Sequence, residues 1–108
     1  MEKFTFIYDR EVDSLFVCRE GRKIHDSVMV GEIIISFDKD YHLAAIEILN
    51  PDLLYRIPKK RLSKISSAKI QVQQRGDVMW IYVILSFKDA RETETLPVQL
   101  QMERPLSA

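Results

Sequence analysis

The sequence predicts a mainly β fold with some α content: an antiparallel sheet of about seven strands in sequential hairpins, with a short helical insert near residues 51–65. Three observations support this prediction. Short runs rich in aromatic and β-branched residues recur along the chain, polar turn sequences separate them, and a clear helix start signal occurs at Asn50-Pro51. The strands are expected to form either a sandwich or a strongly bent meander.

The first half of the chain is expected to contain two hairpins. Residues 4–8 and 15–18 are aromatic and β-branched, and the polar sequence DREVD connects them. A long strand is predicted over 28–37, and after the turn sequence DKDYH it pairs with a strand over 43–49.

The second half begins with the helical insert. Asn50 suits a helix N-cap and Pro51 suits the first helical position, so helical turns are expected in PDLLYR and then in PKKRLSKI. Three further strands are predicted over 68–74, 78–87 and 96–102. Pro97 cannot donate a backbone hydrogen bond and therefore favours an edge strand.

Length and composition predict one soluble domain over residues 1–108. The chain is 46% hydrophobic and 30% charged, as in ordinary globular domains. We see no apolar run near the roughly 20 residues that span a bilayer, and no signal-peptide pattern in MEKFTFIYDR. One cysteine, Cys18, offers neither an internal disulfide nor a zinc site. We therefore expect a cytoplasmic protein without a cofactor or a membrane partner.

Two stretches, YDREVDSLFV (8–17) and EIIISFDKDYHLAAIEIL (32–49), resemble a small prokaryotic family of unknown function. The family pattern is Tyr-Asp-x-Glu-x-Asp-x-Leu, followed by hydrophobic residues, Asp, and Gly-Ile-Glu-Ile-Leu. This chain departs from it at Ala45, where the family often has glycine, and in the turn at 38–42, which lacks glycine. The resemblance implies a compact β-rich fold without a catalytic activity. Some members look like antitoxin partners of small toxins, which implies a small protein partner.

Charge is unevenly distributed although the formal net charge is zero. The segment 55–75 contains no acidic residue and seven basic ones, namely Arg56, Lys59, Lys60, Arg61, Lys64, Lys69 and Arg75. Such a segment can bind phosphate, with Tyr55 as a stacking group, which makes weak nucleic-acid binding one functional alternative. The acidic remainder of the chain opposes electrostatic steering to nucleic acid, so we do not favour this partner.

An acidic hairpin provides a second alternative. Asp9, Glu11 and Asp13 alternate and would share one face of an extended chain, where they could converge with Glu47 on a hard cation. That arrangement would suit a small metal-dependent or acid–base enzyme. In a turn the same carboxylates are ordinary hydrogen-bond acceptors, and we favour this structural interpretation.

Glu47 interrupts the otherwise apolar run AAIEIL. A carboxylate in the interior is costly without a partner, so a compensating group is expected. The basic segment returns just after this strand, and we predict a structural ion pair between Glu47 and one of Arg56, Lys59, Lys60 or Arg61. The hydroxyl groups of Tyr8 and Tyr82 are the next choice.

The strand over 78–87 is apolar on both faces, whereas most antiparallel sheets leave one face polar. Trp80, Tyr82 and Ile84 share one of these faces and form a candidate interface. Two sources of cover are open: a second copy of the protein, or the apolar residues of the helical insert, which are Leu53, Leu54, Leu62 and Ile65. Since no catalytic constellation is recognisable, we predict a non-enzymatic interaction module, most simply a homodimer, and an antitoxin-like partner protein is one form of this prediction.

Overall fold

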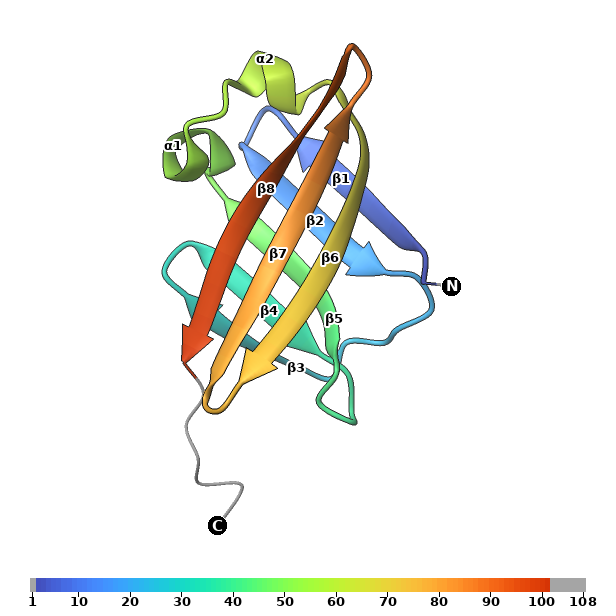
Figure 1. Ribbon diagram of the computed structural model, residues 1–108, viewed down its shortest axis with the longest axis vertical. Coiled ribbons are helices and arrows are strands. Elements are labelled where there is room, and N and C mark those ends of the chain that lie inside the picture. Colours follow the sequence, from blue (N-terminus) through green and yellow to red (C-terminus); the bar gives the residue numbers. More distant parts are fainter. Residues whose placement is uncertain (1, 102–108) are drawn as a thin grey trace.

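The computed structural model describes residues 2–101, which form two antiparallel sheets on either side of one core (Figure 1). The first sheet has five strands, in the spatial order β1 (Phe4–Asp9), β2 (Ser14–Arg19), β5 (Leu43–Leu49), β4 (Ile33–Phe37) and β3 (Asp26–Val30). The second sheet has three strands, in the order β6 (Ile65–Arg75), β7 (Val78–Phe87) and β8 (Ala90–Gln101). The prediction of a mainly β antiparallel fold is confirmed, with eight strands.

The long strand predicted over 28–37 is wrong, because this stretch contains the two strands β3 and β4 and the turn between them. Gly31 adopts a left-handed φ of 60° in this turn, and Val30 pairs with Ile33 across the hairpin. Glycine reaches this conformation without the steric penalty of a Cβ atom. The turn was overlooked because a single glycine in an apolar run looks like part of one strand.

The expectation of purely sequential hairpins is also corrected. After β2 the chain crosses to the far edge of the sheet, and β2 pairs with β5 instead of β3. Strand β5, LAAIEIL, is the most thoroughly buried of the five strands, since all but two of its residues are buried. A strand of this kind is best placed at the sheet centre, where it has neighbours on both sides.

The helical insert consists of two short helices, α1 (Pro51–Tyr55) and α2 (Lys59–Leu62), at one end of the sandwich (Figure 1). Pro51 begins α1 as predicted. Asn50 occupies the N-cap position, but its φ is 54° and its side chain makes no capping hydrogen bond. Ile57 and Leu62 enter the core, so the insert closes this end of the molecule. Within the described residues, no helix has the length and apolar character needed to span a bilayer.

In the second sheet, β7 is the central strand and its alternate residues are buried along its whole length. Strand β8 begins at Ala90, earlier than predicted, and Pro97 lies on this edge strand as expected. Met102, which the predicted last strand included, lies outside the described residues. The inward residues of β6, β7 and β8 pack against those of the first sheet in one hydrophobic cluster.

Candidate functional site

Glu47 lies in the middle of β5 on the outer face of the five-stranded sheet. Ile46 and Ile48 are fully buried and point into the core, so Glu47 points the opposite way. The side chain is only partly buried, and its Oε2 accepts a 2.9 Å hydrogen bond from the hydroxyl of Ser14 on β2. The carboxylate therefore has a polar partner, which is a neutral hydroxyl.

The predicted ion pair between Glu47 and the basic segment does not form among the described residues. Arg61 instead forms an ion pair with Glu94 at 3.0 Å, and Lys64 forms one with Asp89 at 2.8 Å. The ion pair is absent because the two groups point in different directions. Glu47 points away from the core, whereas the basic segment crosses the end of the sandwich toward the second sheet.

The strand register places a row of side chains across the outer face of the five-stranded sheet. We call this row the Glu47 face; in spatial order it comprises Ile7, Phe16, Glu47, Ile34 and Met29. Ile7 and Met29, at the two ends, are 67% and 63% exposed. Phe16 and Ile34 flank the carboxylate and are partly buried. The face is therefore apolar apart from one central carboxylate.

Beside this row lies a second one of small side chains, made of Thr5, Cys18, Ala45, Ser36 and Ser27. The Thr5 hydroxyl lies 3.0 Å from the Cys18 sulfur, and the hydroxyls of Ser27 and Ser36 are 2.9 Å apart. These polar atoms interact with one another across neighbouring strands. They leave the sheet surface next to the Glu47 face uncharged.

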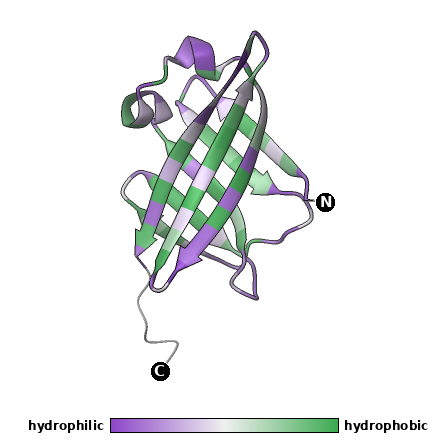
Figure 2. Ribbon diagram, viewed as in Figure 1, coloured by the Kyte–Doolittle hydropathy of each residue, from purple (hydrophilic) through white to green (hydrophobic). Residues whose placement is uncertain are grey.

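The outer face of the second sheet carries the other candidate surface. We call it the Trp80 face; it comprises Val78, Trp80, Tyr82 and Ile84, all partly exposed. Figure 2 looks onto this sheet and shows β7 as largely hydrophobic between two flanking strands with hydrophilic bands. The helical insert does not supply the cover considered above, because Leu53 and Leu54 are 77% and 44% exposed. Leu62 and Ile65 pack in the core instead.

The acidic hairpin serves local structure. Asp9 Oδ1 accepts hydrogen bonds from the backbone N–H groups of Glu11 and Val12, at 3.0 and 3.4 Å, and so shapes the turn. Asp13 is 4% exposed and accepts a 2.7 Å hydrogen bond from the hydroxyl of Tyr8. Burial, followed by this hydrogen bond and the charge of Asp13, raises the pKa of Tyr8 well above its usual value.

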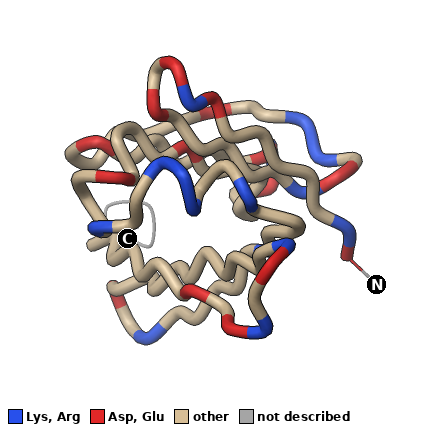
Figure 3. The backbone as a smooth tube through the Cα atoms, turned by 90° about the horizontal axis from the view of Figure 1, so that it is seen from above, with Lys and Arg blue, Asp and Glu red and all other residues tan. Residues whose placement is uncertain are grey.

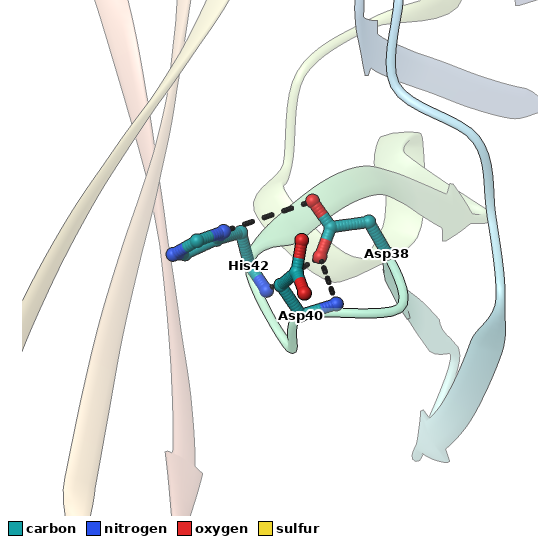
Figure 4. A group of neighbouring side chains, drawn as sticks. All are labelled: Asp38, Asp40 and His42. Atoms are coloured by element: carbon teal, nitrogen blue, oxygen red, sulfur yellow. Dashed lines mark hydrogen bonds and ion pairs between the residues drawn. The ribbon is translucent and has the colours of Figure 1, made fainter.

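The four carboxylates proposed for a metal site do not converge. Within residues 2–101, the group whose ligand atoms do lie together comprises Asp38, Asp40 and His42, all within 4.8 Å of one another. Figure 4 shows these three side chains around the turn between β4 and β5. Sequence reasoning treated this turn only as a connection, although its Asp-x-Asp-x-His spacing was a visible signal.

Asp38 already accepts three hydrogen bonds from protein donors. Its Oδ1 accepts the backbone N–H groups of Asp40 and His42, both at 2.9 Å, and its Oδ2 accepts a 2.7 Å charge-assisted hydrogen bond from Arg22. Burial acts to raise the pKa of the Asp38 carboxyl, but the hydrogen bonds from His42, Arg22 and Asp40 outweigh it and lower the pKa below the usual value. A guanidinium already bound to this carboxylate opposes the entry of a metal cation.

Three other cations of the basic segment lie at the helical end of the molecule, whereas Lys69 and Arg75 lie on β6. Arg56, Lys59 and Lys60 line a shallow surface hollow together with Arg10 from the β1–β2 turn. Figure 3 looks down on this end and shows that charged residues gather mostly in turns and helices. Tyr55 is not free to stack on a base, because it packs against the core and its hydroxyl donates to the carbonyl of Pro97 at 2.9 Å.

Comparison with known proteins finds similarity to one part of this chain. Residues 5–50 match the family described as "Protein of unknown function (DUF2283)". A stretch of 62 residues is 39% identical to "Uncharacterized protein MJ0789" of Methanocaldococcus jannaschii, covering 57% of this chain and 53% of that protein. The chain thus spans about half the length of this relative. No solved structure matches the chain.

The matched region coincides with the five-stranded sheet, which runs from Phe4 to Leu49. Both helices and the three-stranded sheet lie beyond it. The Glu47 face belongs to the matched part, and the Trp80 face does not. Residues 5–50 are therefore similar to the DUF2283 family, whose function is unknown, and in this chain that region is built as a five-stranded antiparallel sheet.

Proposed function

We propose that this protein is a non-enzymatic interaction module that forms homo-oligomers, most simply dimers, through the Trp80 face. The observation that carries the proposal is the partly exposed stripe of Trp80, Tyr82 and Ile84 along the central strand of the second sheet. Aromatic side chains are enriched at the centres of protein interfaces, where they bury large areas at a small entropic cost.

The strands that flank this stripe support self-association. Tyr82 is paired with Gln71 on β6 and Pro97 on β8, and Trp80 with Gln73 and Gln99. These neighbours are uncharged, so two copies can meet face to face at this point without bringing like charges together. An apolar centre between polar uncharged flanks is the usual composition of an interface core with its rim.

Charge on this face lies toward its ends. Lys69 is paired with Ile84 and Arg75 with Val78, both from edge strand β6. An antiparallel arrangement of two copies about an axis near Tyr82 keeps these cations at the rim, where water still solvates them. Rim charges of this kind affect association rates more than affinity.

Sedimentation velocity over a micromolar concentration range tests the proposal. The wild-type protein is expected to sediment as a dimer, and a Tyr82→Lys variant as a monomer, because it places a charge in the centre of the contact. Leu53→Lys makes the same kind of change at a site that is 77% exposed on α1, and it should leave the dimer intact. A wild-type protein that remains monomeric throughout this range contradicts the proposal.

A further inference from the structure

We propose that the Glu47 face is a docking surface for a different protein, one whose contact face presents an arginine or lysine surrounded by apolar side chains. The inference goes beyond the proposed self-association, since it concerns the other sheet and another class of partner. Self-association through the Trp80 face can therefore fail experimentally while this inference holds, and the reverse is also true.

The first argument is the apolar character of the outer face. The inner face of the five-stranded sheet already packs against the core, and the outer face of such a sheet is normally polar. Here the row across the sheet instead presents Ile7, Phe16, Ile34 and Met29 around the carboxylate. Five strands spaced about 4.8 Å apart make this row roughly 19 Å long, which is enough to receive a strand or a helix of a partner.

The second argument is the charge of the face. Among the outward-facing residues of the five strands, Asp9 and Glu47 are acidic and none is a lysine or arginine. The outward-facing residues of this sheet therefore do not supply a cation to Glu47. The Asp9 carboxylate is engaged by backbone N–H groups of its own turn, so the charge at the centre of the row is that of Glu47.

The third argument is the unused hydrogen-bonding capacity of Glu47. A carboxylate can accept about four hydrogen bonds, and Ser14 supplies one. In the free protein, water satisfies the rest because the side chain is only partly buried. A purely apolar partner would strip this water and leave a buried charge, which is strongly unfavourable. A guanidinium or ammonium group replaces the lost water with a charge-assisted pair.

The same argument selects against a second copy of this chain as the occupant. Two Glu47 faces stacked about a two-fold axis near Glu47 would bring two carboxylates together in an apolar contact. Like charges placed opposite each other in an interface are strongly unfavourable and suppress that pairing. Charge complementarity therefore favours a heterologous partner with a central cation.

A displayed library of random short peptides tests this inference on the intact protein. Selection is carried out on the wild type, on Glu47→Lys, and on Glu11→Lys as a control that makes the same charge change in the exposed β1–β2 turn. The wild type and the control are expected to enrich peptides with an arginine or lysine flanked by apolar residues. Glu47→Lys should lose this preference and favour an acidic residue at the same place.

One selected peptide and its twin, in which glutamate replaces the cation, are then titrated by fluorescence anisotropy. The cationic peptide should bind Glu47→Lys at least about tenfold more weakly than wild type, a loss that corresponds to about 1.4 kcal/mol. The acidic twin should regain about the same factor on Glu47→Lys. Glu47→Gln, which keeps an acceptor for Ser14, should bind both peptides with similar affinity, and thermal melts of each variant establish that it is folded.

Three results would overturn the inference. The first is a selection on wild type that yields no peptide, and the second is a cationic peptide that binds Glu47→Lys as tightly as wild type. The third is an NMR map in which the peptide shifts the resonances of the Trp80 face and leaves Phe16, Ile34 and Ser14 unchanged. The first two results leave the self-association through the Trp80 face untouched.

Discussion

Replacing Tyr8 by phenylalanine is expected to lower the free energy of unfolding by about 1.5–3 kcal/mol, the range for hydrogen bonds to charged groups. The Tyr8 hydroxyl donates to Asp13 at 2.7 Å, and Asp13 is 4% exposed. Phenylalanine keeps the ring packed against the core but leaves the carboxylate without this donor. The lower free energy of unfolding therefore results from the buried Asp13 carboxylate that has lost its donor, because the phenylalanine ring leaves no cavity.

Changes at Asp13 separate this hydrogen bond from backbone strain. Asp13 has a φ of 51°, a left-handed conformation that costs a residue with a plain Cβ roughly 1–2 kcal/mol and costs glycine almost nothing. Asp13→Gly removes the carboxylate without adding strain, whereas Asp13→Ala removes it and adds the strain. Asp13→Ala should therefore be less stable than Asp13→Gly by about 1 kcal/mol.

Urea denaturation of Tyr8→Phe, Asp13→Gly and the double variant gives the coupling energy directly. We expect a coupling of at least about 1 kcal/mol, because each single change already removes the same interaction. Tyr41→Phe is the matched control: this tyrosine is 63% exposed, and its variant should fall within about 0.5 kcal/mol of wild type. Single effects that add without coupling would refute the role given to this pair.

The same pair predicts a response to alkaline pH. The pKa of Tyr8 is raised in the folded protein by burial and by Asp13, so the unfolded chain loses its phenolic proton first, near the ordinary value of 10.0. The stabilising contribution is therefore fully present below pH 10 and is lost as the pH rises above it. The Tyr8→Phe variant should lose less stability over this range, as measured by urea denaturation at several pH values.

Three further predictions concern other parts of the molecule. Tyr55→Phe should lower the free energy of unfolding, followed by thermal melts, by about 1 kcal/mol, because the hydrogen bond to the Pro97 carbonyl of β8 is lost. Burial raises the pKa of Tyr55 to about 12, so the stabilising contribution of its protonated hydroxyl is also lost as the pH rises above 10. The lowered pKa of Asp38 gives stability that is present above its ordinary value of 3.8 and lost as the pH falls below it; Arg22→Ala should move the acid transition seen by circular dichroism to higher pH. Glu47→Gln should change the free energy of unfolding by less than about 1 kcal/mol, since the amide oxygen still accepts from Ser14. A loss of several kcal/mol in urea would indicate a charged partner instead.

Local patterns in the sequence were sufficient for most elements of the fold. The β1–β2 hairpin, most of β6 and the two-sided apolar strand β7 are predictable because each is bounded by polar turn residues. The insert was predicted from Pro51, which fits the first position of a helix. The turn at Gly31 was missed because apolar residues continue on both sides of it, so periodicity gave no boundary.

Tertiary pairing could not be predicted from such patterns. The paired positions of β2 and β5 join residues 27 to 35 positions apart, and no local signal in either strand specifies the other. For the same reason the partner of Glu47 was assigned to the nearby basic segment, while the structure supplies Ser14 from β2. The sequence did identify Glu47 as a carboxylate that needs a partner, and this part of the expectation agrees with the hydrogen bond.

The fluorescence of Trp80, the one tryptophan in the chain, tests the central claim of self-association most directly. In a dimer formed through the Trp80 face, the indole is shielded, so its emission should be blue-shifted and resistant to acrylamide at micromolar concentration. Dilution should shift the emission to the red and increase quenching, until both match those of the monomeric Tyr82→Lys variant. A wild-type protein whose emission and quenching equal those of Tyr82→Lys at every concentration would contradict the account.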